Sequence, residues 1–429
     1  MLVFWVMKHR ALLPLAFVLL AVPGLPAAPL TPVEQKIVAR VDAHREDFAR
    51  DLQEAVAIDS ATENLAGVRR MGDVFSRQLR EIGFDSRFVE LPASTGRAGH
   101  LVAEHRGTKG KRVLLIGHLD TVYPGANYSR EGDLVHGAGT GDMKGGDVVL
   151  VHALRALREA GALDDTQIIV VMTGDEEAPG NPLDVVRHDL LEAAKRSDIA
   201  LAFESAVGLT GTVARRGSIS WVLEVQGTTG HSSGMFSAAM GSGSVYEMAR
   251  ILTGFHEELR KLDGVTCNPG LVAGGADGDL TRTGGKVAGK TNIIAQRTVV
   301  RGDLRTVSAE QLATAQARMQ EIVARNLPRT SATLTFSEGY PAMPPAPANY
   351  ELLAQLDQVS RDLGQGEITA LDPRSRGAGD IAFVSPPLPG LDGLGLGGKG
   401  EHTRNESSDL STAPELVKRA AVLLYRLTR

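Results

Sequence analysis

The sequence predicts an α/β domain with a mostly parallel central sheet, interrupted by a separate α+β module. Continuous apolar runs such as residues 113–116 and 168–171 lie between helical patterns. Such runs are typical of strands buried on both faces of a parallel sheet. Beyond residue 212 the strand pattern changes to alternation of apolar and polar residues. The 429-residue chain is also longer than the roughly 250–300 residues that one core usually serves, so we expect two domains.

The first residues resemble a secretory signal peptide. A basic start at residues 8–10 precedes an uncharged apolar run at 11–22, and Ala27 and Ala28 offer a small-residue cleavage site. The run is too short to cross a bilayer comfortably. We therefore expect residues 1–28 to be removed and the mature protein to be secreted, in the periplasm. An uncleaved anchor is the alternative, and Met7 is a more natural start than Met1.

The elements of the first domain follow in order from residue 29. Thr31, Pro32 and Glu34 form a capping box at a helix start, and apolar residues keep helical spacing as far as residue 56. Further elements are predicted from periodicity and from buried apolar runs. They are helices at 65–82, 142–160 and 184–195, and strands at 111–117, 167–172 and 198–203.

The inserted module is predicted to contain four strands and two helices. The strands are expected at 218–225, 291–294, 298–304 and 332–336, and the helices at 242–262 and 310–326. A proline-rich linker after Tyr340 marks its end. The predicted division is main domain 29–213, inserted module 214–340 and main domain again 341–429.

Composition excludes several classes of function. The net charge of −5 is small for this length, which argues against nucleic acid as a main partner. The chain has one cysteine, Cys267, so no internal disulfide can form. We expect Cys267 to be a small buried residue without chemistry.

Histidine and acidic motifs follow the predicted strands, where open α/β sheets bind ligands. His118 and Asp120 lie two residues apart after the first buried strand. A neutral imidazole is a common zinc ligand, and a nearby carboxylate often orients it. Alone, His118 would be read as a histidine of a surface loop.

Asp142 lies in a glycine-rich turn that opens a helix. The sequence Gly137-Ala-Gly-Thr-Gly-Asp-Met-Lys has neither the spacing of a dinucleotide fingerprint nor that of a phosphate loop. A carboxylate there could bridge two metal ions. The more ordinary role of an aspartate before a helix is that of N-cap.

The remaining candidates are two acidic groups and a late histidine. Glu176 and Glu177 follow a buried strand and point in different directions, so one could bind metal while the other handles a proton. A solvated acidic turn is the alternative, more plausible for Asp175. Glu204 ends another strand and could form a structural salt bridge. His402, in a glycine-rich loop, could be an exposed loop residue.

Taken together, these motifs resemble one enzyme family. The order His-x-Asp-Thr-Val, Gly-Asp-Met-Lys-Gly-Gly, Asp-Glu-Glu, Glu204 and His402 is similar to that of the two-zinc metallopeptidases. That family includes bacterial glutamate carboxypeptidase, acetylornithine deacetylase and succinyl-diaminopimelate desuccinylase. The resemblance implies a zinc-peptidase domain with an inserted, ferredoxin-like lid and dimerisation module.

The resemblance also implies the roles of the residues. His118 and Glu204 would hold one zinc, Glu177 and His402 the other, and Asp142 would bridge them. Asp120 would orient His118, and Glu176 would be the general base. Two zinc ions would balance the three ligand carboxylates and a hydroxide, which makes partial burial tolerable. Cobalt or manganese could also occupy such ligands.

Three residues of the inserted module complete the implied site. His231, in Gly230-His-Ser-Ser, would stabilise the oxyanion from the partner subunit of a homodimer. Without the resemblance, a structural histidine at a strand end is equally plausible. Asn292 and Arg305 would bind the free carboxylate of the substrate, since the guanidinium fork suits a carboxylate. Residues 376–380 would line the pocket opposite.

The expected function is that of an exopeptidase that releases a C-terminal amino acid. Export favours this prediction, because the biosynthetic deacylases of the family usually work in the cytoplasm. The alternative enzyme is an N-acyl-amino-acid deacylase. A metal-free binding or scaffold protein is a third hypothesis, which the complete ligand set makes less attractive.

Overall fold

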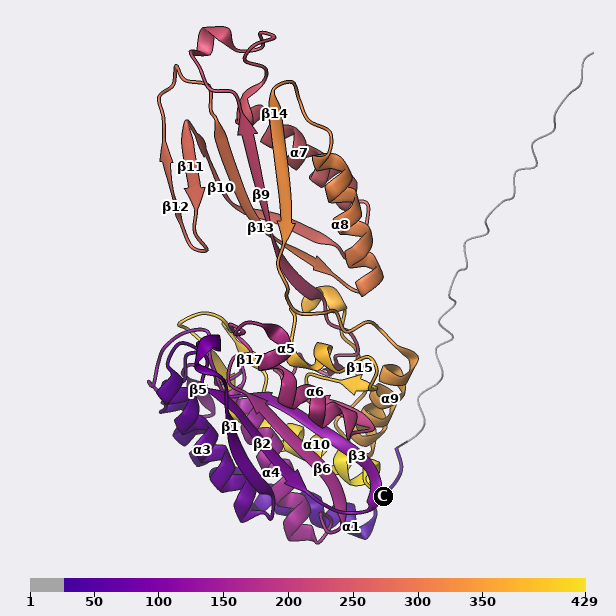
Figure 1. Cartoon of the computed structure of the whole chain (residues 1–429). Helices are drawn as coiled ribbons and strands as arrows, with labels where there is room; N and C mark the ends of the chain where they lie inside the picture. Colours follow the sequence, from indigo (N-terminus) through magenta and orange to yellow (C-terminus); the bar gives the residue numbers. More distant parts are fainter. Residues whose placement is uncertain (1–26) are drawn as a thin grey trace, which may run out of the picture.

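The computed structural model describes residues 27–429. The expected signal peptide, apart from its last two residues, therefore lies outside the described residues. Within residues 27–429, no helix is both long enough and apolar enough to cross a membrane. The division of the chain at residues 213 and 340 stays a prediction. What the structure shows is a six-stranded sheet and a separate four-stranded sheet, β10-β13-β9-β14, each with its own core (Figure 1).

The central sheet of the main domain has six strands in the order β1-β2-β6-β3-β7-β16. β3, β6, β7 and β16 run parallel, whereas β2 pairs antiparallel with β6, and β1 pairs antiparallel with β2 at the edge. The mostly parallel sheet is confirmed. The bounds are β1 Asp85–Glu90, β2 Gly99–His105, β3 Lys109–His118, β6 Thr166–Thr173, β7 Ile199–Ala202 and β16 Gly390–Leu391.

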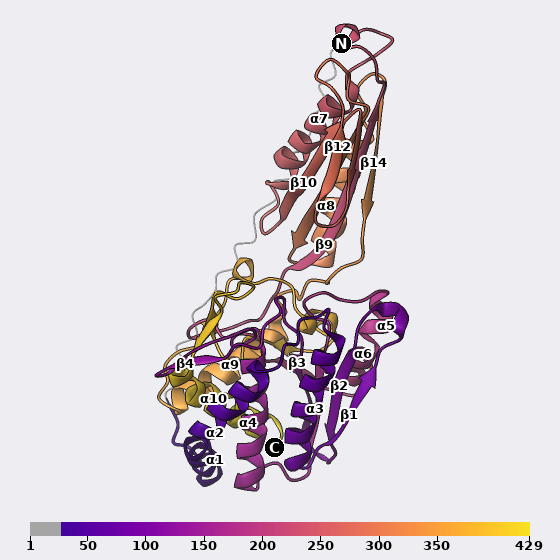
Figure 2. The same ribbon diagram turned by 90° about the vertical axis from the view of Figure 1, so that its left-hand side faces the viewer.

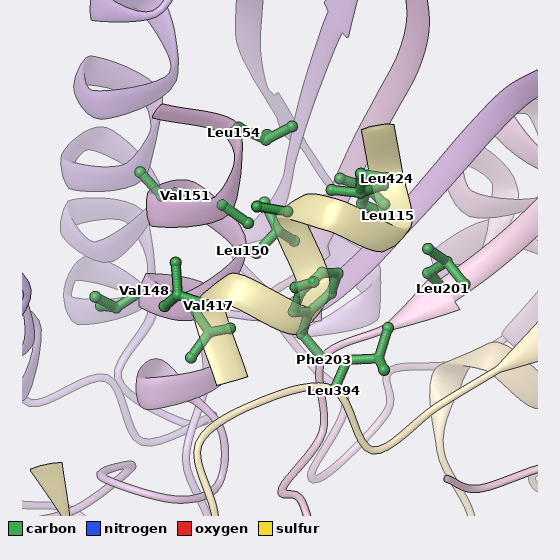
Figure 3. Close-up of a cluster of buried hydrophobic side chains, with 14 of the residues drawn as sticks. Leu115, Val148, Leu150, Val151, Leu154, Leu201, Phe203, Leu394, Val417 and Leu424 are labelled. Atoms are coloured by element: carbon green, nitrogen blue, oxygen red, sulfur yellow. The ribbon is translucent and has the colours of Figure 1, made fainter. Parts of the chain in front are cut away.

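Helices cover both faces of this sheet. On one face, Leu115 and Leu201 meet apolar side chains of α4 and α10, such as Leu150, Val417 and Leu424 (Figure 3). On the other, Leu114 and Ile116 pack with Leu190 of α6. The bounds are α1 Pro32–Ala43, α2 Arg45–Val56, α3 Leu65–Glu81, α4 Lys144–Ala160, α5 Leu183–Val186, α6 His188–Lys195, α9 Pro347–Asp362 and α10 Ala413–Leu427.

Capping agrees with the sequence at the start of the first helix. Thr31 and Glu34 form the expected capping box. The helical spacing up to residue 56 nevertheless corresponds to two helices, which are divided at His44. The ring of His44 lies between Asp47 and Glu159, 2.5 Å and 2.9 Å away, so it holds this break against α4.

A second, four-stranded antiparallel sheet forms the inserted module, in the order β10-β13-β9-β14. Trp221, Leu223 and Phe255 are buried between this sheet and its two helices. The bounds are β9 Gly217–Gly227, β10 Thr266–Gly275, β13 Arg297–Thr306, β14 Thr330–Phe336, α7 Gly243–Leu259 and α8 Ala309–Val323. Cys267 on β10 is half-buried beside this core.

One strand of this module was predicted wrongly. Residues 291–294 form a turn, in which the amide of Ile293 donates to the carbonyl of Lys290 at 3.0 Å. The strand beside β13 is β10 instead, and a hairpin of β11 Asp277–Leu280 and β12 Gly285–Ala288 precedes the turn. β10 contains Pro269 and several glycines and is largely exposed, so it has no apolar alternation that sequence reading could detect.

Two segments connect the main domain with the inserted module. They pair with each other, since Arg215 and Met343 exchange main-chain hydrogen bonds of 2.9 and 3.0 Å. The inserted module rises from this connection to one side of the main domain (Figures 1 and 2). The remaining short strands are β4 Ser129–Glu131, β5 Leu134–His136, β8 Thr210–Gly211, β15 Thr369–Ala370, β17 Gly398–Lys399 and β18 Ser407–Asp409.

Candidate metal centre

His118 is the last residue of β3, and its ring is fixed from one side. Its Nδ1 lies 3.0 Å from the main-chain carbonyl of Asp120 and 3.4 Å from that residue's carboxylate. An Nδ1–H that donates there leaves Nε2 with a free lone pair. Nε2 lies 3.2 Å from Asp142 and 3.9 Å from Glu204. Asp120 thus contacts Nδ1 of His118 on the side away from Asp142 and Glu204, and its main-chain carbonyl is the nearer acceptor.

Asp142 connects two groups of possible ligands. Its Oδ1 faces His118, and its Oδ2 lies 2.9 Å from Nε2 of His402, which in turn is 3.2 Å from Glu177. His118, Asp142 and Glu204 form one set of donor atoms within 4.8 Å of each other, and Asp142, Glu177 and His402 form another. Asp142 is not the N-cap of α4, which is Met143. The glycine turn thus presents its carboxylate to both sets.

Asp120 is a fully buried carboxylate that organises the acidic loop after β6. It accepts hydrogen bonds from the main-chain amides of Glu176 and Glu177, at 3.0 and 3.1 Å. The hydroxyl of Thr62 donates to it at 2.7 Å. These hydrogen bonds fix the main chain of the two glutamates, and the three donors stabilise the negative charge of Asp120.

The electrostatics of the five candidate ligands favour a bound cation. Burial and the neighbouring charge of Asp142 raise the pKa of Glu177 to about 7, and burial and Asp142 also raise the pKa of Glu204 to about 7. Burial raises the pKa of Asp142 too, but hydrogen bonds from His118 and His402 outweigh it. Carboxylates this close repel one another unless protons or cations lie between them. Imidazole and carboxylate donors suit several divalent metals.

Glu176 lies beside this cluster and outside both ligand sets. It lines the same cleft as Asp142, Glu177 and Glu204. Burial raises the pKa of Glu176 well above its usual value, and the charges of Glu204 and Glu177 act in the same direction. A carboxylate of this kind holds a proton more readily than an exposed one.

The acidic run contains a structural member that the sequence did not identify as such. Asp175 is fully buried, 2.6 Å from the guanidinium of Arg187, which also lies 2.9 Å from Asp380. The hydroxyl of Tyr340 accepts from Arg187 at 2.7 Å and donates to the carbonyl of Glu176 at 2.7 Å. Asp175 is therefore part of a buried ion-pair network and not of a solvated turn.

Arg215 is another residue that sequence reasoning missed. Its Nη1 lies 2.7 Å from Asp392 and 3.5 Å from Glu204, and its Nε donates to the carbonyl of Gly377 at 3.1 Å. The adjacent Arg215 and Arg216 carry no signal of such a contact in the sequence, because the partners of Arg215 come from elsewhere in the chain.

A cleft of about 540 Å³ contains the candidate centre. Its walls include Glu176, four of the five expected ligands and Arg305, whose Nε lies 2.9 Å from Asp303. Of residues 376–380, Arg376, Gly377 and Ala378 also line this cleft, whereas Asp380 belongs to the buried network of Arg187. His118 lies beneath this surface, 1% exposed.

His231 and Asn292 lie away from this cleft. β9 begins at the connection to the main domain and ends at the opposite end of the inserted module (Figure 1). His231 follows that end and pairs with Ile293, and the amide of Ser232 donates to the carbonyl of Asn292 at 3.0 Å. His231 and Asn292 are both exposed. The structure brings these two residues together, but within one chain it does not bring them to the metal ligands.

Comparison with known proteins places this geometry in context. Residues 114–427 match the model of peptidase family M20/M25/M40. Carboxypeptidase G2 of Pseudomonas sp. (strain RS-16) is 25% identical over 391 residues, 88% of each chain. Succinyl-diaminopimelate desuccinylase of Gluconobacter oxydans is 29% identical over 359 residues, 79% of this chain and 87% of the other.

Solved structures share the fold. The aminopeptidase PepT of Bacillus cereus has a TM-score of 0.70 with 18% identity, covering 90% of this chain and 99% of its own. An M20 family metallo-carboxypeptidase of Sulfolobus solfataricus has a TM-score of 0.65 with 13% identity, covering 88% and 98%.

The buried network around Arg187 makes a prediction about stability. Arg187→Met should destabilise the fold by about 3–5 kcal/mol, because Asp175 and Asp380 would stay buried without a cation. Arg196→Met is the control. Arg196 is half exposed, and its partner Glu104 also has Arg106 3.6 Å away, so the loss of Arg196 should cost about 0–1 kcal/mol. Urea unfolding measures both. Equal small losses would show that the network contributes little.

Proposed function

This chain belongs to peptidase family M20/M25/M40, and we propose that it is an exopeptidase with two metal ions that hydrolyses the amide bond to a C-terminal amino acid. The observation that carries the proposal is the sharing of Asp142 by two ligand sets. The similarity to carboxypeptidase G2 over 88% of both chains supports the choice of reaction.

The residues that would hold the metals are the five predicted ligands. His118 and Glu204 would bind one ion, Glu177 and His402 the other, and Asp142 both. The donor set of two imidazoles and three carboxylates fits zinc, and cobalt and manganese as well. When bound, such a pair supplies the Lewis acidity that polarises a carbonyl and lowers the pKa of water.

Glu176 is the proposed general base. It would take a proton from the attacking water and give it to the nitrogen of the leaving amine. Two contacts hold its main chain in place: its amide donates to Asp120, and its carbonyl accepts from Tyr340. The side chain is thereby directed into the cleft from a fixed backbone.

The free carboxylate of the substrate is the proposed partner of Arg305. Arg305 lines the cleft beside the candidate centre. Its side chain contacts Asp303 and is still partly exposed. A guanidinium has enough donors to keep that contact and still bind a carboxylate. Asn292 is proposed to assist from the second copy of the chain.

A homodimer is proposed because His231 and Asn292 are remote from the cleft of their own chain. A second copy would bring them to the centre, where the imidazole could donate to the developing oxyanion. Exposed apolar side chains on the same module, among them Phe236 at 69% and Tyr246 at 54% exposure, support a contact surface there. Secretion to the periplasm is proposed from the pattern in residues 8–28 alone.

A panel of substrates tests the reaction. The metal-loaded protein should release the C-terminal residue from dipeptides and from a folate-like amide, and C-terminal amidation of the same peptide should abolish release. Liquid chromatography of the products measures this. Hydrolysis of N-acyl amino acids but of no peptide or folate-like amide would favour the deacylase. No hydrolysis and no bound metal would favour a scaffold.

Replacement of the proposed base separates chemistry from metal binding. Glu176→Gln should lower kcat by a factor of about 10²–10⁴, because the proton acceptor is lost while the ligands stay in place. Metal content, measured by mass spectrometry of the purified protein, should match the wild type. Glu338→Gln, at another glutamate of the cleft wall, should keep most of the turnover. Near-normal kcat in Glu176→Gln would show that another group is the base.

A mixing experiment tests the role of His231 in the partner. Glu176→Gln and His231→Ala should each be nearly inactive alone. In mixed dimers, a chain with an intact Glu176 receives an intact His231 from its partner, so equal mixing should restore about a quarter of the wild-type sites. Steady-state rates after subunit exchange measure this. No recovery in dimers shown to be mixed, or a fully active monomer by light scattering, would contradict the assignment.

A further inference from the structure

Glu406 lies directly behind the turn that presents Asp142. Its Oε1 accepts hydrogen bonds from the amides of Gly141 and Asp142, at 2.8 and 2.9 Å. Its Oε2 accepts from the amide of Gly139 at 2.8 Å. One carboxylate thus receives three main-chain donors from four consecutive residues. No motif in the sequence pointed to this residue.

Glu406 is buried, and the hydrogen bonds to its carboxylate all come from the glycine turn. The residue is 6% exposed, so its carboxylate depends on these donors in place of water. Its main-chain carbonyl also accepts from the amide of Gly137, at 3.2 Å. Gly137 and Gly139 have φ angles of 147° and 85°, in the region that favours glycine.

Glu406 also fixes the segment that carries His402. It immediately precedes β18, whose Ser407 pairs with His136 of β5, and His136 directly precedes the glycine turn. Between β17 and Glu406 the chain forms an exposed loop with His402 at φ 57°. The same residue therefore anchors the end of the His402 loop and the turn of Asp142, two segments about 260 positions apart in the sequence.

We propose that Glu406 is a positioning residue of the metal centre, which sets the placement of Asp142 relative to His402. The inference rests on the metal centre of the proposed function. The site of Asp142, Glu177 and His402 would depend on Glu406 through two ligands. The site of His118, Asp142 and Glu204 would depend on it only through Asp142, since His118 and Glu204 are placed by β3 and by the segment after β7.

The substitution Glu406→Gln isolates this role. The side chain keeps its shape, but an amide NH₂ replaces one acceptor oxygen and meets a main-chain N–H that needs an acceptor. The turn must shift or leave that donor unpaired, at a cost in placement of Asp142. Loss of an outer partner of a metal ligand typically weakens metal binding by about 10–100-fold.

Metal titration of the full chain, freed of metal by chelation, tests the proposal without any substrate. Zinc is added in competition with a coloured chelator, and cobalt is added while the visible absorption spectrum is followed. In Glu406→Gln, one of the two binding steps should weaken by about 10–100-fold, and the other should weaken less. The cobalt spectrum of the weakened step should change, because ligand geometry determines it.

A second acid-to-amide substitution, at the far end of β18, is the control for the loss of a carboxylate. Asp409 also accepts a main-chain hydrogen bond, from Ser411 at 2.9 Å, and it caps the short helix at Leu410–Thr412 that leads into α10. Asp409→Asn should bind both metal ions like the wild type. Wild-type affinities and spectra in Glu406→Gln, or an equal loss in both steps, would overturn the proposal.

Hydrogen exchange of the wild-type chain supplies a readout that does not depend on a folded variant. On addition of zinc, peptides covering residues 137–143 and 400–407 should gain protection together. Protection of the His402 loop with no change in the turn would overturn the proposal. Absence of zinc binding by the wild type would instead contradict the metal centre itself, and normal binding without hydrolysis would contradict only the reaction.

Discussion

The structure depends on one constraint, the gathering of buried carboxylates at the carboxyl ends of β3, β6 and β7. Asp142, Glu177 and Glu204 lie around His118 and His402 at distances of 2.9–3.9 Å. Such a cluster is unfavourable when it is ionised and unaccompanied, and burial raises the pKa of Glu177 and of Glu204 to about 7. The surrounding chain is arranged to hold these groups in place. Three residues outside the ligand sets contact the cluster. Asp120 accepts from the amide of Glu177, Arg215 approaches the carboxylate of Glu204, and Glu406 accepts from the amide of Asp142.

The parts of the fold that sequence predicted are those with a strong local signal. The apolar runs of β3, β6 and β7 are buried on both faces, and each is followed at once by polar residues of the site. The edge strand β1 and the exposed β10 lack such runs, because one face or one edge of each meets solvent. Asp142 was expected on a glycine-rich turn that opens a helix, and it lies on the turn before α4.

The contacts around the ligands could not be predicted, because they join distant positions. Arg215 meets Asp392 across 177 residues, and Tyr340 meets Glu176 across 164. Charge pattern cannot distinguish these residues from ordinary surface arginines and tyrosines. The resemblance to a family indicated each candidate ligand. The contacts that hold these residues in place are visible only in the tertiary structure.

The two connecting segments join the two sheets and also contact the candidate centre. Arg215 lies on one segment and approaches Glu204 at 3.5 Å, and Tyr340 lies on the other and donates to the carbonyl of Glu176 at 2.7 Å. The segments pair with each other through Arg215 and Met343. A rotation of the inserted module would act on these paired segments first. Since their side chains contact a metal ligand candidate and the backbone of the proposed base, the orientation of the module and the geometry of the centre are mechanically linked.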